Sequence, residues 1–90
     1  MYKKDNIAII SGKLPSTKDW YQLTLPSGFT SDNCFVLAKV RYNNNFVMAT
    51  SHFNAVERFE VAFAGSTGLW INVVDTAIFG QDYTIMLIKV

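Results

Sequence analysis

The chain contains few of the side chains that catalysis or metal binding requires. His52 is its only histidine and Cys34 its only cysteine, so a catalytic triad or a metal centre would have to include one of them. No nucleophile-elbow motif lies near His52, and Cys34 lies inside an apolar run that is typical of a buried thiol. Most of the acidic residues stand beside turn residues, where aspartate commonly caps local structure. We therefore predict a protein that is not an enzyme and that has no metal or other cofactor.

Aromatic and amide side chains offer a different chemistry, the recognition of carbohydrate. The apolar face of a sugar ring packs on an aromatic ring, and a few polar side chains bind the hydroxyl groups. The predicted ligand-binding residues are Tyr42, Asn43, Asn44, Asn45, His52, Asn54 and Trp70. The alternative is that the aromatic side chains belong to the core and that the asparagines serve only in turns.

The elements that would position these residues are β-strands. Short apolar or alternating runs are separated by Gly, Pro, Asn and Asp, which is typical of sandwiches and barrels, and no run has helical spacing over the length of a helix. We predict an all-β fold, a small antiparallel β-sandwich of about seven strands that forms a single domain over residues 1–90. The predicted strands are Ile7–Ile10, Trp20–Leu25, Cys34–Tyr42, Phe46–Ser51, Phe59–Ala64, Leu69–Val74 and Tyr83–Val90.

Three groups of turn-forming residues separate these runs. Ser11-Gly12 is expected to end the first strand, and Pro26-Ser27-Gly28 is expected to form a turn after the second. Asn43-Asn44-Asn45 predicts a tight hairpin, because asparagine tolerates the left-handed backbone conformation better than any residue except glycine.

The last strand is apolar on both faces, which indicates self-association. Ile85 and Leu87 can point to one face while Met86 and Ile88 point to the other. Hydrophobic residues make up 50% of a chain of only 90 residues, although surface should dominate in so small a domain. We predict a homo-oligomer, with a trimer favoured, whose interface contains Trp70, Val74, Met86, Ile88 and Val90.

The charged residues are few and scattered. They make up 17% of the chain and give a formal net charge of +1, without a basic run that would follow a nucleic-acid backbone. No segment approaches the length of a membrane span, and no cleaved signal peptide is predicted at the start. We expect neither nucleic acid nor membrane insertion.

Two stretches resemble one family. Residues 25–36 resemble an LPxGFTxxNxxV segment of the C-terminal β-modules of bacteriophage tail-fibre and baseplate receptor-binding proteins, and residues 83–90 are similar to their closing strand. The resemblance implies a compact sandwich at the tip of a trimeric fibre, some examples of which look like H-type lectins. It also implies a receptor of host cell-surface carbohydrate. Individual binding residues do not carry over, because no ligand motif is matched.

Two functions are therefore expected from the sequence. The first is non-enzymatic binding of a cell-surface glycan by an oligomeric phage-tail-type module. The alternative is a structural fibre-cap or capsid-decoration protein without a soluble ligand. The expected location is the virion tail, an extracellular particle, or a bacterial cytoplasm in which the protein is made without a signal peptide.

Overall fold

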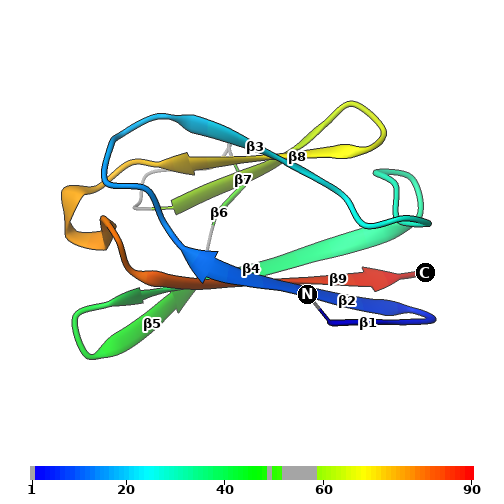
Figure 1. The fold of residues 1–90 in the computed structure, drawn as a ribbon, viewed down its shortest axis with the longest axis horizontal. Coiled ribbons are helices and arrows are strands. Elements are labelled where there is room, and N and C mark those ends of the chain that lie inside the picture. Colours follow the sequence, from blue (N-terminus) through cyan, green and yellow to red (C-terminus); the bar gives the residue numbers. More distant parts are fainter. Residues whose placement is uncertain (1, 49, 52–58) are drawn as a thin grey trace.

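The computed structural model describes residues 2–48, 50–51 and 59–90 and shows an all-β sandwich of two sheets (Figure 1). This confirms the predicted fold class. Sheet A has five strands in the order β1 (Tyr2–Lys4), β2 (Ile7–Lys13), β9 (Asp82–Lys89), β4 (Cys34–Tyr42) and β5 (Asn45–Met48). Sheet B has four in the order β3 (Trp20–Thr24), β8 (Gly68–Val73), β7 (Phe59–Ala64) and β6 (Thr50–Ser51). A short 3₁₀ turn, η2 (Thr76–Ile78), precedes β9.

Strand β9 lies at the centre of sheet A and pairs antiparallel with β2 and β4. Its side chains alternate between the faces: Ile85 and Leu87 are fully buried against sheet B, whereas Met86 and Ile88 are half-buried on the outer face. The remaining described pairs are also antiparallel except that β6 runs parallel to β7. Apolar residues on both faces of β9 thus have two different environments, one inside the sandwich and one outside it.

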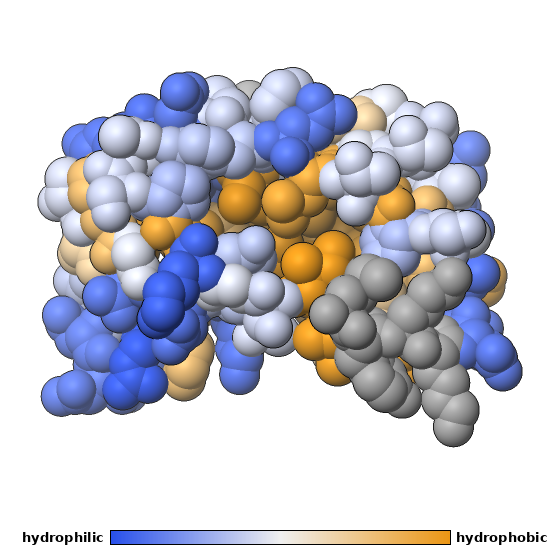
Figure 2. Space-filling view, viewed as in Figure 1, coloured by the Kyte–Doolittle hydropathy of each residue, from blue (hydrophilic) through white to orange (hydrophobic). Residues whose placement is uncertain are grey.

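The core fills the space between the two sheets. Fully or nearly fully buried side chains come from both sheets and from the loops between them: Ala8, Ala38, Val40, Ile85, Leu87, Phe59, Leu69, Ile71, Val73, Leu14, Leu25, Phe29 and Ile78. Figure 2 views the sandwich as in Figure 1, and hydrophobic surface gathers in the seam between the two layers. The buried strand positions follow the two-residue period of a β-strand, so each sheet contributes one apolar face.

The loop after β3 holds its shape through its own polar groups. The side-chain nitrogen of Asn33 donates to the Gly28 carbonyl at 3.0 Å, and its side-chain oxygen accepts from the backbone N–H of Thr30 at 2.9 Å. Gly28 has φ +87°, a conformation that glycine adopts without strain. The loop turns Phe29 into the end of the core, where the ring is 2% exposed. The residues that carry the family resemblance in this stretch therefore have a structural role.

Three larger differences separate the observed strands from the sequence prediction, besides shifts of one residue at other strand ends. Ser11-Gly12 does not end the first strand, because β2 continues to Lys13 and Gly12 pairs with Tyr83. A Cβ on Gly12 would lie 3.2 Å from the Tyr83 ring, so this glycine makes room for the aromatic side chain. The predicted strand Phe46–Ser51 divides into β5 and β6, which belong to different sheets. Strand β1 forms a hairpin with β2 and was not expected.

The predicted hairpin at Asn43-Asn44-Asn45 forms between β4 and β5, but its turn contains only Asn43 and Asn44, because Asn45 is the first residue of β5. Asn43 has φ +55°, and Tyr42 pairs with Asn45 across the turn. Left-handed backbone is the conformation that a two-residue hairpin with the right-handed strand twist requires. Asparagine at this position is thus explained by the turn itself.

Cys34 begins β4 as a buried thiol. Its thiol donates a hydrogen bond to the Thr30 carbonyl, with Sγ 3.1 Å from the oxygen, and the residue is 7% exposed. Burial raises the pKa of the thiol, and the ammonium group of Lys89 opposes this shift more weakly. The folded protein therefore disfavours the thiolate.

We expect stability to fall above about pH 8.5, the ordinary pKa of a thiol, because the unfolded chain then ionises Cys34 while the folded chain keeps its proton. The contribution is complete below that pH and is lost as the pH rises toward the higher folded-state pKa. Urea unfolding of the wild type and of Cys34→Ala, under reducing conditions from pH 7.5 to 9.5, measures it. The stability of the wild type should decline relative to the variant; a constant difference across this range would contradict the assignment.

Candidate functional site

The outer face of sheet B gathers aromatic and amide side chains on two neighbouring strands. Strands β3 and β8 pair so that Trp20 lies opposite Asn72 and Gln22 lies opposite Trp70. All four side chains point away from sheet A, because Tyr21, Leu23, Leu69 and Ile71 occupy the alternate positions and pack on the core. We call these four residues, Trp20, Gln22, Trp70 and Asn72, the sheet B face.

The two tryptophans contact each other edge to face. Their ring centroids are 6.2 Å apart and the ring planes make an angle of 81°. They stand diagonally across the β3–β8 pair, a separation that large aromatic side chains can span. Trp70 is 37% exposed and Trp20 is half-buried, so an indole surface faces solvent beside a fixed second ring.

A hydrogen bond holds the amide of Asn72 in place, and the amide of Gln22 lies close to the neighbouring strand. The side-chain nitrogen of Asn72 donates to a carboxylate oxygen of Glu60 at 2.7 Å, and Glu60 is only 8% exposed. The amide of Gln22 lies over Gly68, where an added Cβ would come within 2.7 Å of its nitrogen and within 2.7 Å of the Ala64 carbonyl oxygen. Gly68 thus allows the exposed Gln22 side chain to lie close to the strand.

This arrangement can bind a ligand that has both an apolar face and hydroxyl groups. An exposed indole offers an apolar surface, and amide groups offer both hydrogen-bond donors and acceptors. The described residues include no group of three or more His, Cys, Asp or Glu that could hold a metal ion. Among residues 2–48, 50–51 and 59–90, no helix is long and apolar enough to cross a membrane.

The ligand-binding residues predicted from the sequence do not form one surface. Tyr42 and Asn45 lie on the β4–β5 hairpin of sheet A, with Asn43 and Asn44 at its turn, and Trp70 lies in sheet B. Tyr42 packs partly against the core, whereas the three asparagines are exposed. Two further predicted residues, His52 and Asn54, lie outside the described residues.

The predicted interface residues are also divided. Met86 and Ile88 are on the outer face of sheet A, and Trp70 is on the outer face of sheet B. Val74 is half-buried just after β8, and Val90 is 82% exposed, with its N–H donating to the Asn33 carbonyl at 2.9 Å. Because the two outer faces point in opposite directions, a single flat interface cannot contain both groups (Figure 1).

Sequence reasoning did not select Trp20, Gln22 or Asn72 as binding residues. Trp20 and Gln22 share a face by the two-residue period, which the sequence does show. Their approach to Trp70 and Asn72 depends on the pairing of β3 with β8, two strands that lie about fifty residues apart in the chain.

Comparison with protein-family models, with curated proteins and with solved structures finds no match for this chain.

Proposed function

We propose that this protein is a non-enzymatic receptor-binding module that recognises carbohydrate on a cell surface, of the kind carried at the ends of bacteriophage tail fibres. The edge-to-face pair of Trp20 and Trp70 beside the amides of Gln22 and Asn72 is the observation that supports it. The resemblance of residues 25–36 and 83–90 to phage receptor-binding modules supports a virion tail that contacts a host as the cellular setting.

The chemistry of the sheet B face favours a sugar over a purely apolar or purely charged ligand. The exposed indole of Trp70 packs on the C–H face of a pyranose ring, and the amides of Gln22 and Asn72 satisfy its hydroxyl groups. A shallow face of this kind encloses little of its ligand, so single-site binding is expected to be weak.

Replacing Trp70 with alanine is expected to weaken carbohydrate binding at least about tenfold, because a central aromatic contact commonly contributes more than 1–2 kcal/mol. A glycan array probed with the labelled protein identifies the oligosaccharide, and titration calorimetry with that oligosaccharide measures the affinity. Trp70→Phe should retain part of the binding, since an aromatic face remains.

Asn44→Ala is the matched control on the β4–β5 hairpin, which belongs to the other sheet. It is expected to leave the affinity unchanged. If Asn44→Ala removes binding and Trp70→Ala does not, the sheet B face is not the site. Absence of any binding across an array of bacterial-surface glycans would count against carbohydrate recognition altogether.

A structural assembly protein is the second candidate function, and the exposed apolar side chains on the outer face of sheet A favour it. Phe35 is 62% exposed and Leu37 46% exposed on the central part of that sheet. An assembly protein would associate through this face and bind no soluble glycan. The array therefore separates the two functions.

A further inference from the structure

The outer face of sheet A carries two adjacent rows of apolar side chains. In the first row Ile88 lies between Ile7 and Phe35, and in the second Met86 lies between Ile9 and Leu37. We call these six residues the apolar rows. The next row is polar, with Thr84 between Ser11 and Lys39, and Met48 lies beyond Lys39.

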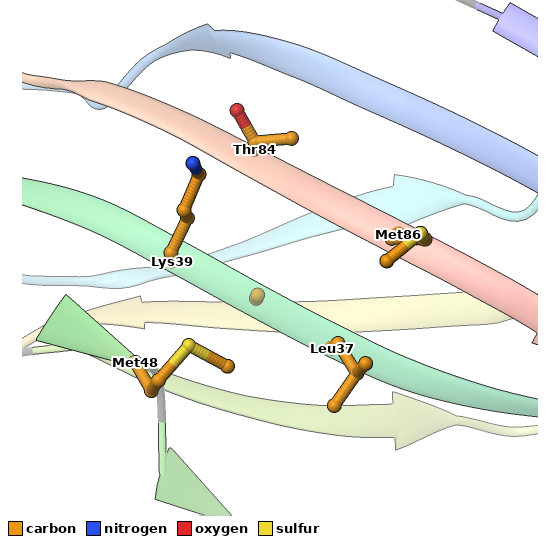
Figure 3. Close-up of a pocket in the computed structure, with 6 residues that line it drawn as sticks. Leu37, Lys39, Met48, Thr84 and Met86 are labelled. Carbon is orange, nitrogen blue, oxygen red and sulfur yellow. The ribbon is translucent and has the colours of Figure 1, made fainter. Parts of the chain in front are cut away.

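A hollow lies next to the apolar rows. It has a volume of about 240 Å³ and is lined by Leu37, Ala38, Lys39, Met48, Thr84 and Met86. Figure 3 shows Leu37 and Lys39 projecting from β4, Thr84 and Met86 from β9, and Met48 from the end of β5. A cavity of about 150 Å³ is enough to hold a benzene ring, so this hollow can accept a phenyl side chain.

Much apolar area is left exposed on this face. The large side chains above one-third exposure are Ile7, Phe35, Leu37, Phe46 and Met48, at 38%, 62%, 46%, 50% and 60%. Phe46 lies outside the overlap proposed below. At roughly 200 Å² for each fully exposed side chain, the other four present roughly 400 Å² of apolar surface, before the half-buried Ile9, Met86 and Ile88 are added. The roughly 800 Å² that each partner buries in a stable interface is only a little more than half non-polar, so the apolar area on this face is close to what one partner of such an interface supplies.

We propose that a second copy of this chain packs on the outer face of sheet A, face to face about a two-fold axis near Leu37 and Met86. The axis runs across the strands, so the rotation places the Ile88 row of one copy over the Thr84 row of the other. Phe35, the one aromatic residue of the apolar rows and 62% exposed, then enters the partner's hollow. One continuous patch meeting itself fits such an isologous pair, whereas a trimer needs two different patches that meet.

The charges on this face agree with the offset. Lys13 and Asp82 form an ion pair of 2.8 Å beyond the Thr84 row, and Lys39 and Arg41 lie over the Phe46 ring with their charged groups 4.5 and 5.6 Å from its centre. The two-fold rotation sends the Lys13 and Arg41 ends of the two copies to opposite ends of the pair. Like charges there do not face each other, and the Ile9–Met86–Leu37 rows of the two copies meet at the axis.

A lipid surface fits this face less well. Strands β1 and β5 are the end strands of sheet A among the described residues. Insertion of the face into hydrocarbon would carry the unpaired backbone groups of these edges out of water at a cost of several kcal/mol for each group. Face-to-face packing of two sheets leaves both edges in solvent.

Sedimentation equilibrium of the full chain from about 1 to 200 μM tests the proposal over the affinity range of weak to moderate dimers. We expect a species of twice the 10.1 kDa chain mass, retained in 1 M NaCl because the contact is apolar. Phe35→Ala should weaken association roughly 10- to 100-fold, since each substitution counts twice in the pair. Phe46→Ala removes an exposed phenylalanine of the same sheet outside the overlap and should leave the dissociation constant unchanged.

Leu37→Glu places a charge near the axis and should yield a monomer with an unchanged far-UV circular dichroism spectrum. Thr24→Glu introduces the same charge on an exposed position of sheet B and should remain paired. If Leu37→Glu does not fold, Phe35→Ala against Phe46→Ala decides the question.

Three results would overturn the proposal: a wild-type monomer at 200 μM, a mass of three chains, or a dimer insensitive to both Phe35→Ala and Leu37→Glu. Co-sedimentation of a monomer with vesicles of phosphatidylcholine and phosphatidylglycerol would assign the face to lipid instead. None of these measurements involves carbohydrate, so the pairing and the proposed receptor function fail or stand separately.

Discussion

Replacing Leu87 by alanine is expected to lower the free energy of unfolding by about 2–5 kcal/mol. Leu87 is fully buried and lies on the central strand of sheet A, opposite Ala8 on one side and Val36 on the other. The truncation removes apolar contacts and leaves a cavity that paired strands on both sides prevent from closing. For a domain of this size a loss of about 3 kcal/mol lowers Tm by roughly 12–24 °C, which differential scanning calorimetry measures.

Thr84→Ala is the matched control for Leu87→Ala. Thr84 is on the same strand but on the outer face, in the polar row next to the apolar rows, so its replacement should cost less than about 1 kcal/mol. Equal losses at the two positions would contradict the assignment of Leu87 to the core and Thr84 to the outer face.

Replacing Phe29 by alanine is expected to cost about 3–5 kcal/mol. The ring is 2% exposed and closes one end of the core, and the Lys89 ammonium lies 4.8 Å from its centre. Burial of the ring accounts for most of the effect, because a cation–π contact contributes about 0.5–2 kcal/mol. Urea unfolding followed by tryptophan fluorescence measures the change.

Phe46→Ala provides the comparison at an exposed ring. Phe46 is 50% exposed on β5 and contacts the charged groups of Lys39 and Arg41. Its loss should cost less than about 1.5 kcal/mol. Lys89→Met separates the two contributions at Phe29, since it keeps an apolar cover over the ring and removes the charge. A Phe29→Ala variant as stable as Phe46→Ala would show that the loop does not close the core.

The two outer faces have a joint consequence if both proposals hold. Packing of sheet A on sheet A leaves the two sheet B faces on opposite outer sides of the pair, because each sheet B covers the inner face of its own sheet A (Figure 1). The pair would therefore link two separate glycan chains rather than bind twice to one flat surface. Geometry of this kind decides whether multivalency raises affinity.

Much of the fold was predictable from the chain because its causes are local. The predicted strands Cys34–Tyr42 and Phe59–Ala64 coincide with β4 and β7, where alternation or an apolar run stands between turn residues. The Asn43-Asn44 turn follows from the backbone conformation that asparagine tolerates. The apolar residues on both faces of β9 also showed that its outer face differs from a solvated sheet.

The sequence by itself determined strands such as β4 and β7, the turn at Asn43 and the alternation of side chains between the two faces of a strand, because these depend on neighbouring residues and on the two-residue period. Only the tertiary structure decided which strands became neighbours. Pairing of β3 with β8 brought Trp20 to Trp70, and pairing of β9 with β2 and β4 joined scattered residues into the apolar rows. Gly12 continued a strand because of Tyr83, some seventy residues away in the chain. The pairing register between distant strands is selected by the packing of the whole core, so no local run of residues predicts it.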